Sequence, residues 1–146
     1  MTQYLLDTNI ASYIIKGLHP AIPQRLVSVP IHQVAISSVT EGELRYGVAR
    51  LPAASRLNAI VEEFLIRIVI RPWDSAAAQE YGRIRAALES RGHTLGNLDL
   101  MIAAHALALG SVLVTHDKAF ARIKGMKIED WTRSQLTTPP RPVNGK

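Results

Sequence analysis

Four acidic side chains are the residues of this sequence best suited to chemistry: Asp7, Glu43, Asp99 and Asp117. They lie far apart in the chain, and each follows an apolar stretch or stands near the start of a helix-like one. Carboxylates gathered in one place repel each other unless protonation or a cation compensates them. Oxygen ligands suit Mg²⁺ or Mn²⁺ rather than Zn²⁺, and the chain has no cysteine and no paired-histidine spacing. The pattern indicates a site for hard divalent cations.

Each acid also has a simpler interpretation as a helix cap. Asp7 and Asp117 could each cap a helix that follows directly. Thr40 and Glu43 match the S/T-x-x-E capping box. Asp99, near the start of a helix, would gain from the helix dipole. Local sequence alone therefore leaves both interpretations open for every one of the four.

The elements that must position these acids alternate between strands and helices. Short apolar runs predict strands, and helical spacing of apolar residues predicts amphipathic helices between them, one of which (98–109) is apolar nearly all round. This alternation predicts an α/β fold with a mostly parallel sheet of four to five strands, covered by helices on both faces. The predicted strands are 4–6, 34–36, 69–70, 112–114 and 126–128, and the predicted helices are 9–16, 40–50, 57–68, 75–90, 98–109 and 118–123, with a further helical stretch before Pro30.

Such a fold brings the four acids together. Helix N-termini gather at the edge where parallel strands end, which is also where these folds bind ligands. Asp7 and Asp117 directly follow predicted strands. Glu43 and Asp99 are expected in the first turns of helices that begin at the same edge. A pair of cations held there could activate water and stabilise the leaving oxygen of a phosphodiester.

Composition limits the class of protein and the kind of partner. The 146 residues suit one domain, expected over 1–133, with a proline-rich and disordered tail over 134–146. No apolar run approaches the length of a membrane span, and the N-terminus does not resemble a signal peptide, so a cytoplasmic location is expected. The formal charge of +5 favours a polyanionic partner, although many soluble domains carry such a charge for solubility alone. An acidic metal site on a basic domain points to nucleic-acid cleavage.

Several segments together resemble the PIN-domain ribonucleases, and specifically the VapC-type toxins of bacterial toxin–antitoxin pairs. The matching segments cover most of residues 4 to 131 in the family's order: LLDTN, ISSVTEGELRYGV, GNLDLMIAAHALALGSVLVTHD and FARIKGMKIEDW. The resemblance implies a three-layer PIN-like domain and a Mg²⁺- or Mn²⁺-dependent endoribonuclease. It also implies a homodimer, a cognate antitoxin laid over the site, and an RNA substrate such as tRNA.

The resemblance further implies roles for individual residues. Asp7, Glu43, Asp99 and Asp117 form the acidic set, with Thr8 and Thr115 as hydroxyl neighbours that orient a carboxylate or a metal-bound water. Helical periodicity does not choose between Glu41 and Glu43, which point to different sides of a helix. The capping box and the family motif both favour Glu43.

Basic, histidine and aromatic side chains could add to the site. Arg45, Lys118 and Arg122 lie near the acids in sequence and could bind RNA phosphates, although solvation of the surface explains each equally well. His105 is expected in the core, and His116 is expected to point away from Asp117. The large aromatic residues, including Tyr46, are expected to pack, since no aromatic cluster of the RNA-recognition-motif kind is visible.

Three other functional classes share some of these features. A receiver-like signalling domain also gathers acids at strand ends, but it requires an adjacent acidic pair after the first strand, where this chain has Asp7-Thr8-Asn9. A phosphotransferase of the haloacid-dehalogenase type requires D-x-D there, and Asn9 breaks that pattern. A non-catalytic nucleic-acid-binding protein has no need of the complete acidic set.

Overall fold

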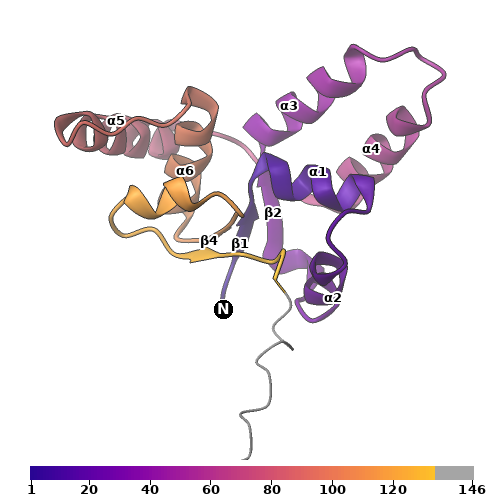
Figure 1. The fold of residues 1–146 in the computed structure, drawn as a ribbon, viewed down its shortest axis with the longest axis horizontal. Helices are drawn as coiled ribbons and strands as arrows, with labels where there is room; N and C mark the ends of the chain where they lie inside the picture. Colours follow the sequence, from indigo (N-terminus) through magenta and orange to yellow (C-terminus); the bar gives the residue numbers. More distant parts are fainter. Residues whose placement is uncertain (134–146) are drawn as a thin grey trace, which may run out of the picture.

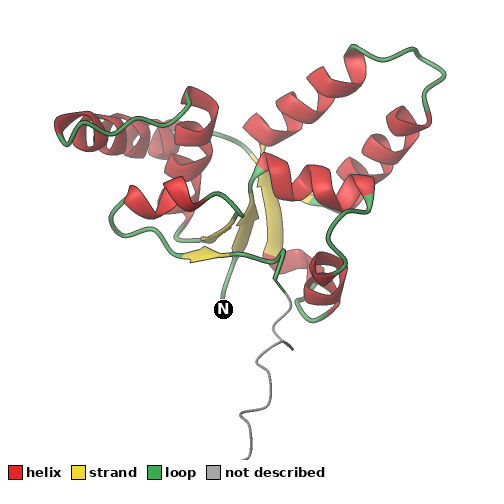
Figure 2. Cartoon of the chain, in the orientation of Figure 1, coloured by secondary structure: helices red, strands yellow, loops and turns green. Residues whose placement is uncertain are grey.

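The sheet at the centre of the protein consists of five short parallel strands in the order β3-β2-β1-β4-β5 (Figures 1 and 2). The computed structural model describes residues 1–133. The predicted parallel sheet is confirmed. A receiver-like fold has the order 2-1-3-4-5, so that alternative is wrong. The strands are β1 (Tyr4–Leu6), β2 (Val34–Ser37), β3 (Val69–Arg71), β4 (Val112–Val114) and β5 (Ile128–Glu129).

Helices cover both faces of this sheet, as the sequence predicts. In Figure 1, α1, α2 and α4 lie to one side of the strands, and α5 and α6 lie to the other. The first side also carries α3, which contacts α1 and α4. The helices are α1 (Thr8–Lys16), α2 (Ala21–Val27), α3 (Ser38–Ala49), α4 (Arg56–Arg67), α5 (Ser75–Ser90) and α6 (Asn97–Leu109), with two 3₁₀ turns, η1 (Ile31–Gln33) and η2 (Lys118–Arg122).

Neighbouring residues of the central strands pack against opposite helical layers. Side chains alternate between the two faces of a strand, so Leu6 and Val114 pack in the layer of α1 and α4. Leu5 and Leu113 pack in the layer of α5 and α6. Both faces are buried, which explains why these strands read as continuous apolar runs rather than as alternating ones.

The helix predicted to be the most deeply buried is α6. Its residues from Ile102 to Ala106 are at most 1% exposed. The helix ends where Gly110 adopts the left-handed conformation, with φ of 65°. Because α6 is buried from Leu100 onwards, packing of this helix fixes the position of Asp99 in its first turn.

Two predicted boundaries were wrong. Helix α3 begins at Ser38 because the Ser37 hydroxyl accepts a hydrogen bond from the Val39 N–H (3.1 Å). Thr40 is therefore inside the helix, the predicted capping box does not form, and Glu43 lies in the second turn. The last strand begins at Ile128, two residues later than predicted, after a turn in which Gly125 has φ of 81°.

Two further predictions concern the C-terminal tail and membrane-spanning segments. The disordered tail predicted at 134–146 lies outside the described residues. Within 1–133, the helices are too short or too polar for any of them to span a bilayer.

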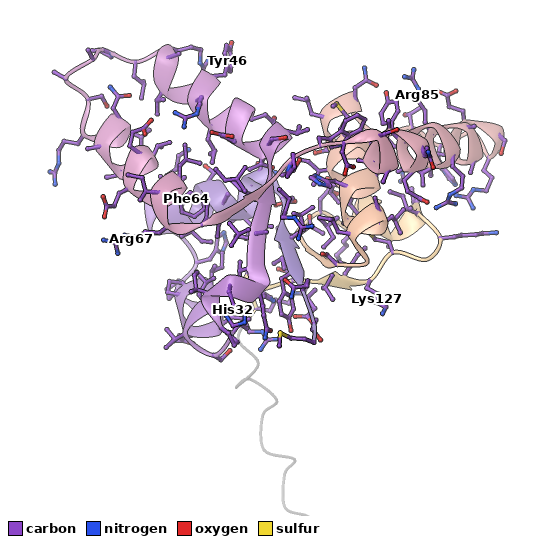
Figure 3. All side chains as sticks on the ribbon, turned by 180° about the vertical axis from the view of Figure 1, so that it is seen from behind. His32, Tyr46, Phe64, Arg67, Arg85 and Lys127 are labelled. Atoms are coloured by element: carbon purple, nitrogen blue, oxygen red, sulfur yellow. The ribbon has the colours of Figure 1, made fainter. Side chains whose placement is uncertain are left out.

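The prediction that Tyr46 packs was wrong, because its side chain is 66% exposed on the outer end of α3 (Figure 3), where Arg50 lies 5.0 Å from its ring centroid.

Candidate active site

Asp7 stands at the carboxyl end of β1 and is only 4% exposed. Its N–H donates to the Val114 carbonyl (3.0 Å), and its Oδ1 accepts from the Ile10 N–H (2.8 Å), so it does cap α1. Burial, together with the nearby charges of Asp99 and Asp117, raises the pKa of Asp7 from 3.8 to about 6, against the opposing effect of the Thr115 hydroxyl and the Ile10 N–H. The cap and the acidic cluster therefore coexist in one residue.

Asp99 reaches the same edge of the sheet from the first turn of α6. Partial burial raises its pKa, and the charges of Asp117 and Glu43 raise it further. Each of the four acids therefore acts electrostatically on at least one of the others. The structure brings together the carboxylates that the sequence leaves scattered.

Glu43 is held in this group by a threonine pair. The Thr8 hydroxyl donates to Glu43 Oε1 (2.6 Å) and lies 3.0 Å from the Thr40 hydroxyl, which is buried on the same helix as Glu43. Glu41 instead binds Arg45 Nε (2.9 Å). Of the two glutamates that periodicity could not separate, Glu43 lies beside the aspartates and Glu41 does not.

Asp117 completes the group from the start of η2. Its Oδ1 accepts from the Ala119 N–H (2.9 Å), and its own N–H donates to the Thr115 hydroxyl (3.0 Å). Thr115 is 1% exposed and lies between Asp117 and Asp7, whose carboxylate it also contacts. Asp7 and Asp117 are both caps, as the simpler interpretation predicts, yet both also face the other acids.

The chemistry of these donors fits Mg²⁺ or Mn²⁺. The raised pKa values of Asp7 and Asp99 report negative charge that a cation would compensate. As the side chains stand, no group of three or more Asp, Glu or His within residues 1–133 is arranged to hold a metal ion. Glu43 is turned to Thr8, while Asp7 and Asp117 are turned to backbone N–H groups. Coordination would require these carboxylates to rotate towards a shared ion.

The three basic residues singled out in the sequence occupy different environments. Arg45 is paired with both Glu41 and Glu62 (2.9 and 2.8 Å), so its charge is largely compensated. Arg122 lies at the far end of η2, where its carbonyl accepts from Arg91. Lys118 is exposed and follows Asp117 directly. Lys118 is the member of the three best placed to meet a substrate at the acids.

Neither of the two histidines near the acids acts on them. His105 is buried in α6, where its Nδ1 lies 2.8 Å from the Ser37 hydroxyl and burial lowers its pKa. Its Nε2 is buried without a geometrically formed hydrogen bond, although the Pro72 carbonyl lies beside the ring. His116 places its Nδ1 2.9 Å from Asp130 Oδ2. His105 is a core residue, as expected, and His116 is turned to Asp130.

Two clefts flank the acids and meet at the first turn of α1. One, of about 340 Å³, includes Thr8, Asn9 and Glu43 and runs between α1 and α3. The other, of about 490 Å³, is lined by six residues: Asn9, Tyr13, His116, Asp117, Lys118 and Arg133. Asn9 lines both clefts, so they adjoin each other, one with Glu43 and the other with Asp117 in its wall. Sequence reasoning missed Tyr13, although its four-residue spacing from Asn9 places the two on one helical face.

The sequence profile of the PIN domain matches residues 4–126. The chain belongs to the PIN-domain family. This PIN domain is 38% identical to the tRNA(fMet)-specific endonuclease VapC of Shigella flexneri over 133 residues, which are 90% of this chain and 100% of that protein. It is 35% identical to ribonuclease VapC2 of Haemophilus influenzae over 132 residues, which are 90% of this chain and 99% of that protein.

Solved structures of VapBC complexes share this PIN domain's fold. DNA-bound VapBC from Salmonella typhimurium superposes with a TM-score of 0.83 at 39% identity, covering 90% of this chain and 99% of that one. VapBC2 from Rickettsia felis, bound to a DNA fragment from its promoter, gives a TM-score of 0.80 at 34% identity, covering 89% and 99%. Sequence and fold agree over nearly the full length of these relatives, which confirms the resemblance to VapC proteins.

Proposed function

We propose that this protein is a Mg²⁺- or Mn²⁺-dependent endoribonuclease that hydrolyses RNA phosphodiester bonds, and that it is the toxin of a toxin–antitoxin pair. The observation that carries the proposal is the electrostatic coupling of Asp7, Glu43, Asp99 and Asp117 at one edge of a PIN-domain sheet. Relatives that are named as nucleases favour catalysis over a non-catalytic nucleic-acid-binding role.

The four acids would supply the oxygen ligands of the cation. Bound metal would lower the pKa of a coordinated water and stabilise the oxygen that leaves phosphorus. Thr8 positions Glu43 through their 2.6 Å hydrogen bond, and Thr115 supports Asp7 and the backbone of Asp117. Asp7 carries a pKa of about 6, so metal binding near that pH is coupled to release of its proton.

The substrate and the partners follow from the relatives and from charge. A relative named for tRNA(fMet) makes tRNA the first substrate to test, and the formal charge of +5 favours a polyanion. Lys118 would bind phosphate beside Asp117, with smaller contributions from Arg45 and Arg122, which lie farther away or are already paired. The solved VapBC complexes support a cognate antitoxin as the inhibitor. A homodimer in the cytoplasm completes the proposal.

Cleavage of a tRNA(fMet) transcript by the purified protein tests the catalytic part. Cleavage is expected with Mg²⁺ or Mn²⁺, and EDTA is expected to abolish it. Asp99→Asn should remove activity because it deletes a ligand of the cation. The matched control is Asp74→Asn, which alters an exposed aspartate that caps α5 outside the cluster. Full activity of Asp99→Asn, or cleavage that continues in EDTA, would overturn the metal-dependent mechanism.

Expression in bacteria tests the toxin part. Induction of the wild-type protein should arrest growth, and co-expression of the neighbouring gene should relieve the arrest. The Asp99→Asn protein should be tolerated at equal abundance. Normal growth at confirmed wild-type expression would contradict the toxin assignment.

A further inference from the structure

The cleft beside Asp117 carries aromatic side chains and an arginine that the proposed hydrolysis does not use, next to Lys118. Its wall includes Tyr13 of α1, and His116, Lys118 and Arg133 from the C-terminal part of the chain. Asp117 forms one edge of the cleft and belongs to the acidic cluster. A molecule that occupied this cleft would therefore lie next to the reacting phosphate.

The Tyr13 and His116 rings line this cleft, and the His19 ring lies beside both of them. The Tyr13 and His19 rings have centroids 4.6 Å apart at an interplanar angle of 54°. The His19 and His116 rings are 6.3 Å apart at 39°. His19 and His116 are both exposed residues, so solvent reaches this group of rings. Proteins bind unpaired bases by stacking them on tyrosine and histidine rings of this kind.

The backbone at His19 is unusual. Its φ is 58°, and within residues 1–133 it is the one non-glycine residue with a positive φ. This conformation costs a residue with a side chain free energy, although histidine adopts it more readily than most. With this backbone conformation the imidazole lies against the Tyr13 ring. Strain of this kind accumulates at functional sites, where surrounding structure holds it in place.

Cations lie next to the rings. Lys118 and Arg133 both line the cleft, and no salt bridge of Lys118 forms within the described residues. Arg133 Nε is 3.8 Å from Asp130 Oδ2, a contact long enough for the guanidinium to turn to another anion. The same Asp130 carboxylate holds His116 at 2.9 Å and so fixes the orientation of that ring. Rings beside Lys118 and Arg133 match the base and the phosphate of a single nucleotide.

We propose that this cleft is a nucleotide subsite, in which an unpaired base of the RNA stacks on the His19 and His116 rings, supported by Tyr13, while Lys118 and Arg133 bind the phosphate on the Asp117 side of the scissile bond. This inference rests on the proposed ribonuclease function and deepens it. The subsite selects for single-stranded RNA, because only an unstacked base can reach the rings.

Single-turnover cleavage of the tRNA(fMet) transcript, with excess protein and Mg²⁺ at pH 8, tests the subsite. The half-saturating protein concentration measures binding, and the rate constant at saturation measures the chemical step. His19→Gly removes the ring at a position where glycine tolerates the positive φ, and His19→Asn does the same with a side chain that also tolerates it. His19→Phe keeps a ring. Lys118→Gln removes a cation of the cleft.

A matched charge control is Lys127→Gln. Lys127 (Figure 3) is exposed and directly precedes β5, whereas Asp7 and Asp117 follow the ends of parallel strands. It should leave both kinetic constants and their salt dependence unchanged.

The ringless His19 variants should raise the half-saturating concentration by about fivefold or more, as expected for loss of one stacked base, and leave the saturated rate constant within about twofold. His19→Phe should restore binding. Lys118→Gln should lower the salt slope of log affinity by about 0.7, as expected for one phosphate contact on a single strand. Thermal unfolding of each variant identifies any that fails to fold, and either folded ringless variant is sufficient to decide.

Unchanged half-saturation in a folded ringless variant, or no rescue by phenylalanine, would overturn the subsite while leaving the nuclease intact. If the wild-type protein cleaves no RNA, the proposed function fails and the subsite fails with it. These results are distinct, because the first requires an active wild-type enzyme.

Discussion

Replacing Asp7 with asparagine should make the protein more stable and inactive at the same time. The carboxylate is 4% exposed, and this burial, with a smaller effect of the charges of Asp99 and Asp117, raises its pKa from 3.8 to about 6. An asparagine oxygen can still accept the Ile10 N–H bond that caps α1, since Asn and Asp cap about equally well. Asp7→Asn therefore removes the unfavourable charge and keeps the local structure.

The pKa shift gives the size of the effect. A rise from 3.8 to about 6 corresponds to roughly 3 kcal/mol of free energy of unfolding. The folded protein holds the proton of Asp7 more tightly than the unfolded chain does. Protonated Asp7 therefore makes its full contribution to the free energy of unfolding below pH 3.8, and this contribution is lost as pH rises to about 6. The effect of the Thr115 hydroxyl is already contained in this pKa shift, but the asparagine Nδ2 brings a further N–H donor into a buried position, which offsets about 1 kcal/mol of the gain. We expect Asp7→Asn to be more stable by about 2 kcal/mol at pH 7.5, or roughly 4–8 °C in Tm.

Urea denaturation in EDTA at pH 7.5 and at pH 4, followed by circular dichroism, measures this difference. The gain should be present at pH 7.5 and should vanish or reverse at pH 4, where wild-type Asp7 is protonated. Asp74→Asn is the control, because Asp74 caps α5 with the same Oδ1 geometry (3.1 Å to the Ala77 N–H) outside the cluster. A loss of stability at pH 7.5 in Asp7→Asn, with none in Asp74→Asn, would refute the argument and leave Asp7 as a structural cap.

Three further outcomes follow from the site. Glu43→Gln should reduce tRNA cleavage by at least tenfold. Glu41→Gln, two residues away and paired with Arg45, should leave the rate constant unchanged. Equal effects of the two substitutions would mean that the wrong glutamate has been placed with the aspartates. Thr8→Val should lower the cleavage rate by about tenfold and leave Tm nearly unchanged, as for other residues that orient a metal ligand. A normal rate would show that Glu43 does not need the hydrogen bond from Thr8. Adding Mg²⁺ should raise the Tm of the wild-type protein but not of Asp99→Asn; equal shifts would place the bound ion elsewhere.

Much of the fold could be predicted because it is encoded locally. Apolar strand runs such as Tyr4–Leu6 and Val112–Val114, the stripe along α4 and the uniformly apolar α6 each identify their element within a few residues. The errors fall where competing local signals exist. Thr40 and Glu43 form a plausible capping box, yet Ser37 begins α3 earlier, because its hydroxyl reaches the Val39 N–H directly after β2.

The sequence by itself determined which residue types were available to the site and that parallel topology would bring them to one edge. Only the tertiary structure decided what each of them does. The pKa of Asp7 depends on burial and on Asp99 and Asp117, which are remote in sequence, so no local pattern contains it. The same holds for Glu43, whose partner Thr8 is supplied by another helix, and for the rings of Tyr13, His19 and His116. Strand and helix signals act over a few residues, whereas charge, burial and ring contacts are set by distances that only folding creates.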